Sequence, residues 1–105
     1  MGINVFDIRH LCQSGLLRWT DHAVKRLIKR AISRADVKQT LLNGKVIEQY
    51  PDDYPFPSCL VSGVAQDGRY LHVVCGIDAK ELWIISSYHP DPEKWTDDFS
   101  KRKEN

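Results

Sequence analysis

Apolar and polar positions repeat with a helical period between residues 20 and 31. On a helical wheel the apolar side chains gather on one side, and they are Ala23, Val24, Leu27, Ile28 and Ala31. The opposite side is basic and consists of His22, Lys25, Arg26, Lys29 and Arg30. Thr20 or Asp21 can cap the first turn by accepting a hydrogen bond from a free backbone N–H group. The pattern predicts an amphipathic helix with one basic face.

Two further helices are predicted, one on each side of this helix in the sequence. Residues 4–14 carry apolar side chains at helical spacing, and Gly15 is suited to end that helix. Residues 16–19 are expected to connect it to the basic helix. Ser33 is a strong N-cap for a third helix, which is expected to stop at Gly44 in the left-handed conformation.

After Gly44 the pattern changes to the period of β-strands. Asp67-Gly68 is a strong signal for a two-residue hairpin turn, and the three prolines between residues 51 and 57 predict a loop. The strands are predicted at residues 45–50, 58–66, 69–77 and 81–88. The expected fold class is α+β, with two to three N-terminal helices packed on a four-stranded antiparallel β-meander.

Length and composition indicate one soluble domain. The chain has 105 residues, of which we assign residues 1–99 to the domain and residues 100–105 to a frayed polar tail. It contains neither a run of about 18 apolar residues nor a signal peptide, so we expect a cytoplasmic protein without a membrane segment. The three cysteines are odd in number and lack CxxC spacing. We therefore expect no disulfide framework, no metal site and no cofactor.

Charge is distributed unevenly along the chain, although the net charge is only +1. Residues 18–45 hold eight Lys or Arg residues and two acidic residues, whereas six basic residues face eleven acidic ones from residue 46 onward. The basic helical part suits a local anionic partner such as a nucleic-acid backbone. The near-neutral total does not suit a protein that coats long duplexes.

His22 and Arg26 are spaced i and i+4 on the basic helix, and Arg30 lies one turn further along. A neutral imidazole can exchange a proton near pH 7, and a guanidinium can hold two phosphate oxygens. This spacing makes the three residues a candidate phosphate site, with Lys25 and Lys29 as further phosphate-binding residues. The alternative is that the basic face is simply solvated.

Tyr88 and His72 are the candidate site residues outside the helix. Strand alternation places Tyr88 on the same face as Leu82, Ile84 and Ser86, at the end of the last strand. A phenol there can donate to a phosphate or transfer a proton. The alternatives are that Tyr88 completes the core and that His72, flanked by apolar residues, is a structural histidine.

Several short motifs occur together in a fixed order. They are Thr20-x-His22-Ala23-x-x-Arg26, Arg30-Ala31-Ile32-Ser33, Asn43-Gly44-Lys45-Val46-Ile47-Glu48, Leu71-His72-Val73-Val74 and Ile84-Ile85-Ser86-x-Tyr88-x-Pro90. In this order they resemble the bacterial family called domain of unknown function 4258 (DUF4258). The resemblance implies membership of the group of small metal-independent ribonucleases and toxins that includes barnase, colicin nuclease domains and RelE-like toxins. It also implies a RelE/barnase-like fold.

The resemblance also implies roles for particular residues. His22 and Arg26 match the helix pair of the family, Arg30 its second arginine, His72 its strand histidine and Tyr88 its terminal aromatic residue. Ser86 stands where the family has Thr, and Ala31 replaces the Gly that usually follows Arg30.

The implied activity is metal-independent cleavage of single-stranded or ribosome-bound RNA by attack of the 2′-OH on the adjacent phosphate. His22, Arg26, Tyr88 and His72 would be catalytic, while Lys25, Lys29, Arg30 and Ser86 would bind RNA phosphates. The implied partner is a small antitoxin, zinc-binding and DNA-binding, in a bacterial toxin–antitoxin pair. A rival hypothesis is a non-catalytic module that binds RNA or protein through the basic helix face.

Overall fold

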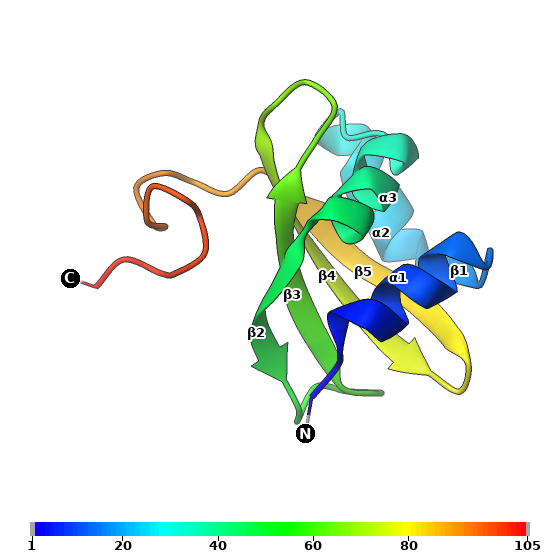
Figure 1. Cartoon of the computed structure of the whole chain (residues 1–105). Coiled ribbons are helices and arrows are strands. Elements are labelled where there is room, and N and C mark those ends of the chain that lie inside the picture. Colours follow the sequence, from blue (N-terminus) through cyan, green and yellow to red (C-terminus); the bar gives the residue numbers. More distant parts are fainter. Residues whose placement is uncertain (1, 105) are drawn as a thin grey trace.

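Three helices cover one face of a five-stranded sheet, and the C-terminal segment lies against the other face (Figure 1). The structure is a computed structural model that describes residues 2–104. Its elements are α1 (Val5–Gln13), β1 (Leu17–Trp19), α2 (Asp21–Lys29), α3 (Arg34–Asn43), β2 (Lys45–Tyr50), β3 (Ser58–Val64), β4 (Tyr70–Asp78) and β5 (Glu81–Tyr88). The predicted α+β class is confirmed.

The helices begin where their capping residues predict. Thr20 caps α2 by accepting a hydrogen bond from the Ala23 N–H at 3.0 Å, and Ser33 caps α3 through the Asp36 N–H at 3.0 Å. Each helix then buries apolar side chains against the sheet, such as Leu27 of α2, which is 3% exposed; Ile28, which we placed on the apolar side of α2, is instead 76% exposed. Within residues 2–104 no helix is both long and apolar enough to cross a membrane.

The end of α2 is a Schellman motif. The Ile32 N–H donates to the Leu27 carbonyl at 2.9 Å, and the Ala31 N–H donates to the Ile28 carbonyl at 3.2 Å. Ala31 has a φ of 55°, which is the left-handed conformation that favours glycine. At the end of α3 the expected left-handed conformation is wrong, because Gly44 has a φ of −86°. A Cβ on Gly44 would lie 2.5 Å from the Ser62 carbonyl oxygen, so close backbone packing requires the glycine.

The sheet has the strand order β1-β5-β4-β3-β2, with β1 parallel to β5. The prediction of a four-stranded antiparallel sheet is therefore wrong, because residues 17–19 form a fifth strand instead of a plain connection. Its hydrogen bonds include Leu82 N–H to the Leu16 carbonyl at 2.9 Å and Thr20 N–H to the Ile84 carbonyl at 3.3 Å. Three residues are too few to show a strand period, so only the neighbouring strand reveals them.

The turn between β3 and β4 has three residues, not the predicted two. The Ala65 N–H donates to the Arg69 carbonyl at 2.8 Å, and the Gly68 N–H donates to the Ala65 carbonyl at 3.0 Å. Gly68 has a φ of 86°. This is the three-residue hairpin in which a turn is followed by a left-handed glycine, so Asp67-Gly68 marked the hairpin but not its length.

A β-bulge in β5 decides which face its last residues occupy. Cys75 pairs with Ile84 and Val74 pairs with Ser86, which leaves Ile85 without a partner on β4. Ser86 and Tyr88 consequently share a face with Val74 and His72, away from the helices. The regular alternation that placed them on the face of Ile84 is wrong for this end of the strand.

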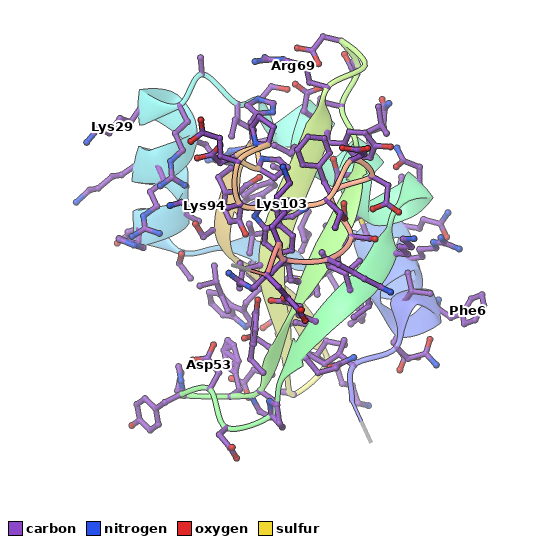
Figure 2. The ribbon with its side chains drawn as sticks, turned by 90° about the vertical axis from the view of Figure 1, so that its left-hand side faces the viewer. Phe6, Lys29, Asp53, Arg69, Lys94 and Lys103 are labelled. Carbon is purple, nitrogen blue, oxygen red and sulfur yellow. The ribbon has the colours of Figure 1, made fainter. Side chains whose placement is uncertain are left out.

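The segment after β5 folds back over the sheet face opposite the helices (Figure 2). Trp95 is 4% exposed and forms a β-bridge with Arg102, and the Lys103 N–H donates to the Lys94 carbonyl at 2.9 Å. Arg102 and Lys103 are thus hydrogen-bonded to the rest of the segment, although we assigned residues 100–105 to a frayed polar tail. Met1 and Asn105 lie outside the described residues.

Candidate phosphate-binding site

Helix α2 lies beside β5 and brings two arginines to the end of that strand. The Thr20 hydroxyl donates to the Ile84 carbonyl at 3.2 Å, which anchors the start of the helix. Further along, Arg26 Nη1 donates to Ser86 Oγ at 3.1 Å and Arg30 Nη1 donates to the Ser87 carbonyl at 2.7 Å. A guanidinium has five N–H donors, so each arginine retains donors for an anion. We call these residues, Arg26, Arg30 and Ser86, the arginine cluster.

Tyr88 and His72 lie opposite each other on neighbouring strands. His72 Nε2 is 2.9 Å from the Phe99 carbonyl oxygen, and Nδ1 is 3.3 Å from the Tyr88 hydroxyl. A carbonyl can only accept, so Nε2 carries the proton and Nδ1 of the neutral ring accepts from Tyr88. The His72 side chain is fully buried and packs edge-on against Trp95, with 4.5 Å between ring centroids. This arrangement is typical of a structural histidine.

The surroundings shift the pKa values of both residues. Burial lowers the pKa of His72, partly offset by the hydrogen bond to the Phe99 carbonyl. Burial raises the pKa of Tyr88, while the charges of Arg102 and Arg30 act in the opposite direction. Tyr88 therefore stays protonated near neutral pH and lies within the field of Arg30.

A second polar group on this face, centred on Glu48, was not predicted from the sequence. Arg102 donates to both carboxylate oxygens of Glu48, at 2.9 and 3.0 Å, and the Tyr50 hydroxyl donates to Glu48 Oε1 at 2.5 Å. The bonds from Arg102 are the main reason that the pKa of Glu48 is lowered. The Arg102 guanidinium also lies 4.7 Å from the centre of the Trp95 ring. The spacing of Glu48 and Tyr50 on one strand face was the only sequence signal for this group.

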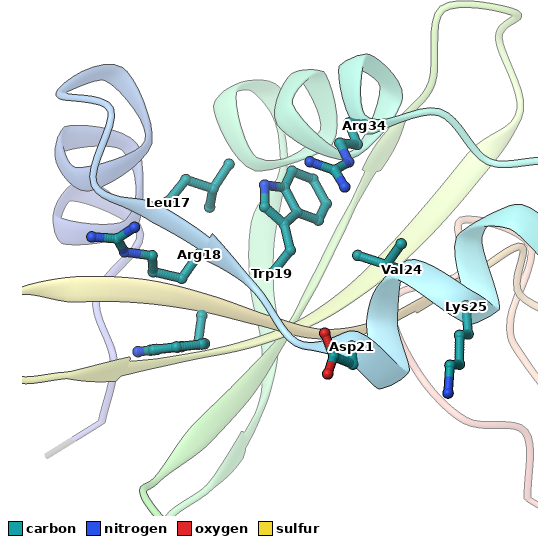
Figure 3. A pocket seen from close by; sticks show the side chains of 8 residues that line it. Leu17, Arg18, Trp19, Asp21, Val24, Lys25 and Arg34 are labelled. Atoms are coloured by element: carbon teal, nitrogen blue, oxygen red, sulfur yellow. The ribbon is translucent and has the colours of Figure 1, made fainter.

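Three of the predicted phosphate-site residues lie outside the arginine cluster. His22 is exposed, one turn before Arg26, and has no polar side-chain contact with residues 2–104. Lys25 lines an open groove of about 560 Å³ that also contains Trp19 and Arg34 (Figure 3). Lys29 extends from α2 into solvent (Figure 2).

The arrangement provides several groups that can bind a phosphate. Two guanidinium groups one helical turn apart lie beside a serine hydroxyl at the end of β5. Arginine forks match the geometry of phosphate oxygens and form charge-assisted hydrogen bonds with them. Within the described residues, 2–104, no group of three or more His, Cys, Asp or Glu side chains could hold a metal ion.

The fold and the cluster together define a class: a small α+β protein whose second helix supplies two arginines to the end of a mixed sheet. The chain belongs to the family described as Domain of unknown function (DUF4258), which matches residues 19–89. The match includes the arginine cluster, His72 and Tyr88, and it ends before the C-terminal segment. No curated protein and no solved structure shows significant similarity to the chain.

Proposed function

We propose that the protein is a metal-independent endoribonuclease that cleaves single-stranded or ribosome-bound RNA at the arginine cluster. The observation that carries the proposal is the pair of guanidinium groups held at Ser86 and Ser87, with the protonated Tyr88 hydroxyl in the field of Arg30. The order of N-terminal helices followed by a sheet supports the resemblance to the RelE/barnase group of ribonucleases. In this proposal the protein is the toxin of a toxin–antitoxin pair, and its partner is a small antitoxin.

The proposed reaction is an internal transfer at phosphorus. The 2′-oxygen forms a bond to phosphorus while the bond from phosphorus to the 5′-oxygen breaks, which leaves a 2′,3′-cyclic phosphate and a free 5′-hydroxyl. His22, one turn from Arg26, accepts the 2′-OH proton, and Tyr88 supplies a proton to the leaving oxygen. Arg26 and Arg30 stabilise the charge that develops on the phosphorane. General acid–base catalysis contributes roughly 10²–10⁴-fold, and a preorganised charge clamp contributes roughly 10²–10³-fold.

A second candidate function is a non-catalytic module that binds RNA or an acidic protein surface. Two observations favour it: His22 makes no polar contact with the described residues, and both nitrogens of His72 are occupied by Tyr88 and Phe99. A binding module requires the arginine cluster to hold an anion but requires no free base beside it. The two functions therefore predict the same binding and different chemistry.

The test is incubation of the purified protein with single-stranded RNA in EDTA, followed by detection of 2′,3′-cyclic phosphate ends. We expect cyclic ends from the wild type, none from His22→Ala and a large loss with Arg26→Lys, which keeps the charge but removes the planar fork. Lys38→Ala is the matched control, because it removes an exposed charge from α3 away from the cluster.

Circular dichroism confirms that each variant is folded. If His22→Ala cleaves as fast as the wild type, His22 is not the base. If the folded wild type binds RNA without cleaving it, free or on ribosomes, and Arg26→Lys weakens that binding, the protein is the binding module.

A further inference from the structure

A second hollow lies at strand β5 and the start of α2, the two elements that carry the arginine cluster. It has a volume of about 390 Å³, and its lining includes Ile85, the residue immediately before Ser86, and Thr20, the N-cap of α2. Ser86 accepts a hydrogen bond from Arg26, so Ile85 in the wall of the hollow is bonded directly to a residue of the arginine cluster. The volume is within the usual range for small-molecule sites, about 300–1,000 Å³.

The walls of the hollow are aromatic. Trp83 lines it from β5, and Tyr54 and Phe56 line it from the loop between β2 and β3. Tyr54 is 91% exposed, so a large aromatic side chain faces solvent at its rim. Aromatic side chains provide stacking surfaces for planar rings, and they accept any base because every base has a π-face.

The loop that carries these aromatic residues is held in place against the sheet. Asp53 accepts hydrogen bonds from the Ser58 hydroxyl at 2.6 Å and from the Tyr54 N–H at 3.0 Å. At Gly76 of β4 a Cβ would lie 2.7 Å from the Pro57 carbonyl oxygen and 3.2 Å from the Phe56 ring. The loop backbone and the Phe56 side of the wall are therefore in place before any ligand binds, which lowers the entropic cost of binding.

The charged groups that line the hollow are two carboxylates, Asp53 and Asp78. Asp78 makes no side-chain hydrogen bond or ion pair with residues 2–104. Carboxylates repel phosphate but accept hydrogen bonds from the N–H groups on the edges of nucleobases. The charge pattern thus separates two environments, one for a base in the hollow and one for a phosphate at the arginine cluster.

We propose that this hollow, the base pocket, holds an unpaired nucleobase of a single-stranded RNA whose phosphate lies at the arginine cluster. The proposal rests on the proposed function, since it assigns a base subsite to the same strand. The base stacks on the aromatic wall, and Asp78 accepts a hydrogen bond from its edge. The sugar and phosphate continue past Ile85 toward Arg26.

The test measures the affinity of a short 2′-deoxy oligonucleotide, which lacks the 2′-OH and is not cleaved. We expect Tyr54→Ala to weaken binding about 5- to 150-fold, the range for losing one stacked base. Phe6→Ala is the matched control, because Phe6 is also an exposed aromatic residue, 69% exposed on α1. An oligonucleotide that lacks the stacked base should bind wild type and Tyr54→Ala equally.

A second readout does not depend on Tyr54. Stacking on Trp83 should quench part of the tryptophan fluorescence when the oligonucleotide binds, and Trp83→Phe should remove that part. If Arg26→Ala weakens binding while Tyr54→Ala and Trp83→Phe change nothing, the base pocket is wrong and the phosphate site stands. The hollow would then be left to another occupant, such as an apolar protein side chain. If no oligonucleotide binds the wild type, the proposed function and the base pocket both fail.

Discussion

Ala31 occupies a position that is built for glycine. It follows the last turn of α2 with a φ of 55°, and its N–H group takes part in the Schellman motif. The left-handed conformation costs a residue with a Cβ about 1–2 kcal/mol. Glycine avoids this cost, but it lowers the stability by about 0.4–1 kcal/mol because it increases the conformational entropy of the unfolded chain. We therefore expect Ala31→Gly to stabilise the protein by about 0.5–1 kcal/mol.

Urea unfolding, followed by tryptophan fluorescence, measures this change in the free energy of unfolding. The midpoint should rise at an unchanged m-value, and Tm should increase by about 2–5 °C. Ala35→Gly is the matched control because Ala35 is exposed and helical in α3. There the same substitution should destabilise the protein by up to about 1 kcal/mol.

The two variants together test the reasoning. If Ala31→Gly lowers the midpoint as Ala35→Gly does, Ala31 is not in the left-handed conformation in solution. Ala31→Gly leaves the Arg30 side chain and its hydrogen bond to the Ser87 carbonyl in place. The affinity for phosphate should therefore be the same in Ala31→Gly as in the wild type. A loss of affinity would mean that the shape of this terminus also positions the arginine.

Three further predictions concern the face opposite the helices. Burial lowers the pKa of His72 from its usual 6.5, so below about pH 7 the unfolded chain binds more protons than the folded chain. The free energy of unfolding should therefore fall as the pH decreases from about 7 toward the lowered pKa. His72→Gln should flatten this part of the pH profile of urea unfolding. Trp95 is buried, so Trp95→Ala should release residues 90–104 from the sheet. Trypsin should then cleave faster at Lys101, while the circular dichroism spectrum stays close to that of the wild type. Arg102→Ala should lower the free energy of unfolding by about 1 kcal/mol or less, because the Arg102 side chain is 61% exposed, although its partner Glu48 is only 24% exposed. Equal cleavage of Trp95→Ala and wild type would contradict the docking of the segment.

The sequence predicts well those features that depend on interactions between neighbouring residues in the chain. Thr20 and Ser33 start their helices through hydrogen bonds that span only three residues, so their neighbours in the chain suffice to identify them. The spacing of Arg26 and Arg30 on one helix face is likewise a local property. The end of α2 was not predicted in this way, because we placed Ala31 on the apolar side of the helix, whereas it follows the helix in the left-handed conformation.

The tertiary structure alone decided which distant groups meet. Residues 17–19 become a strand only because β5 offers a free edge, and the bulge at Ile85 turns Tyr88 toward His72. Ion pairing of Arg102 with Glu48 joins residues 54 positions apart. These contacts depend on strand register and on long-range packing of distant segments, neither of which produces a periodic pattern in the sequence. The amino-acid pattern therefore determined the helices, the strands β2 to β5 and the basic face, whereas tertiary packing determined β1 and the groups that each candidate side chain contacts.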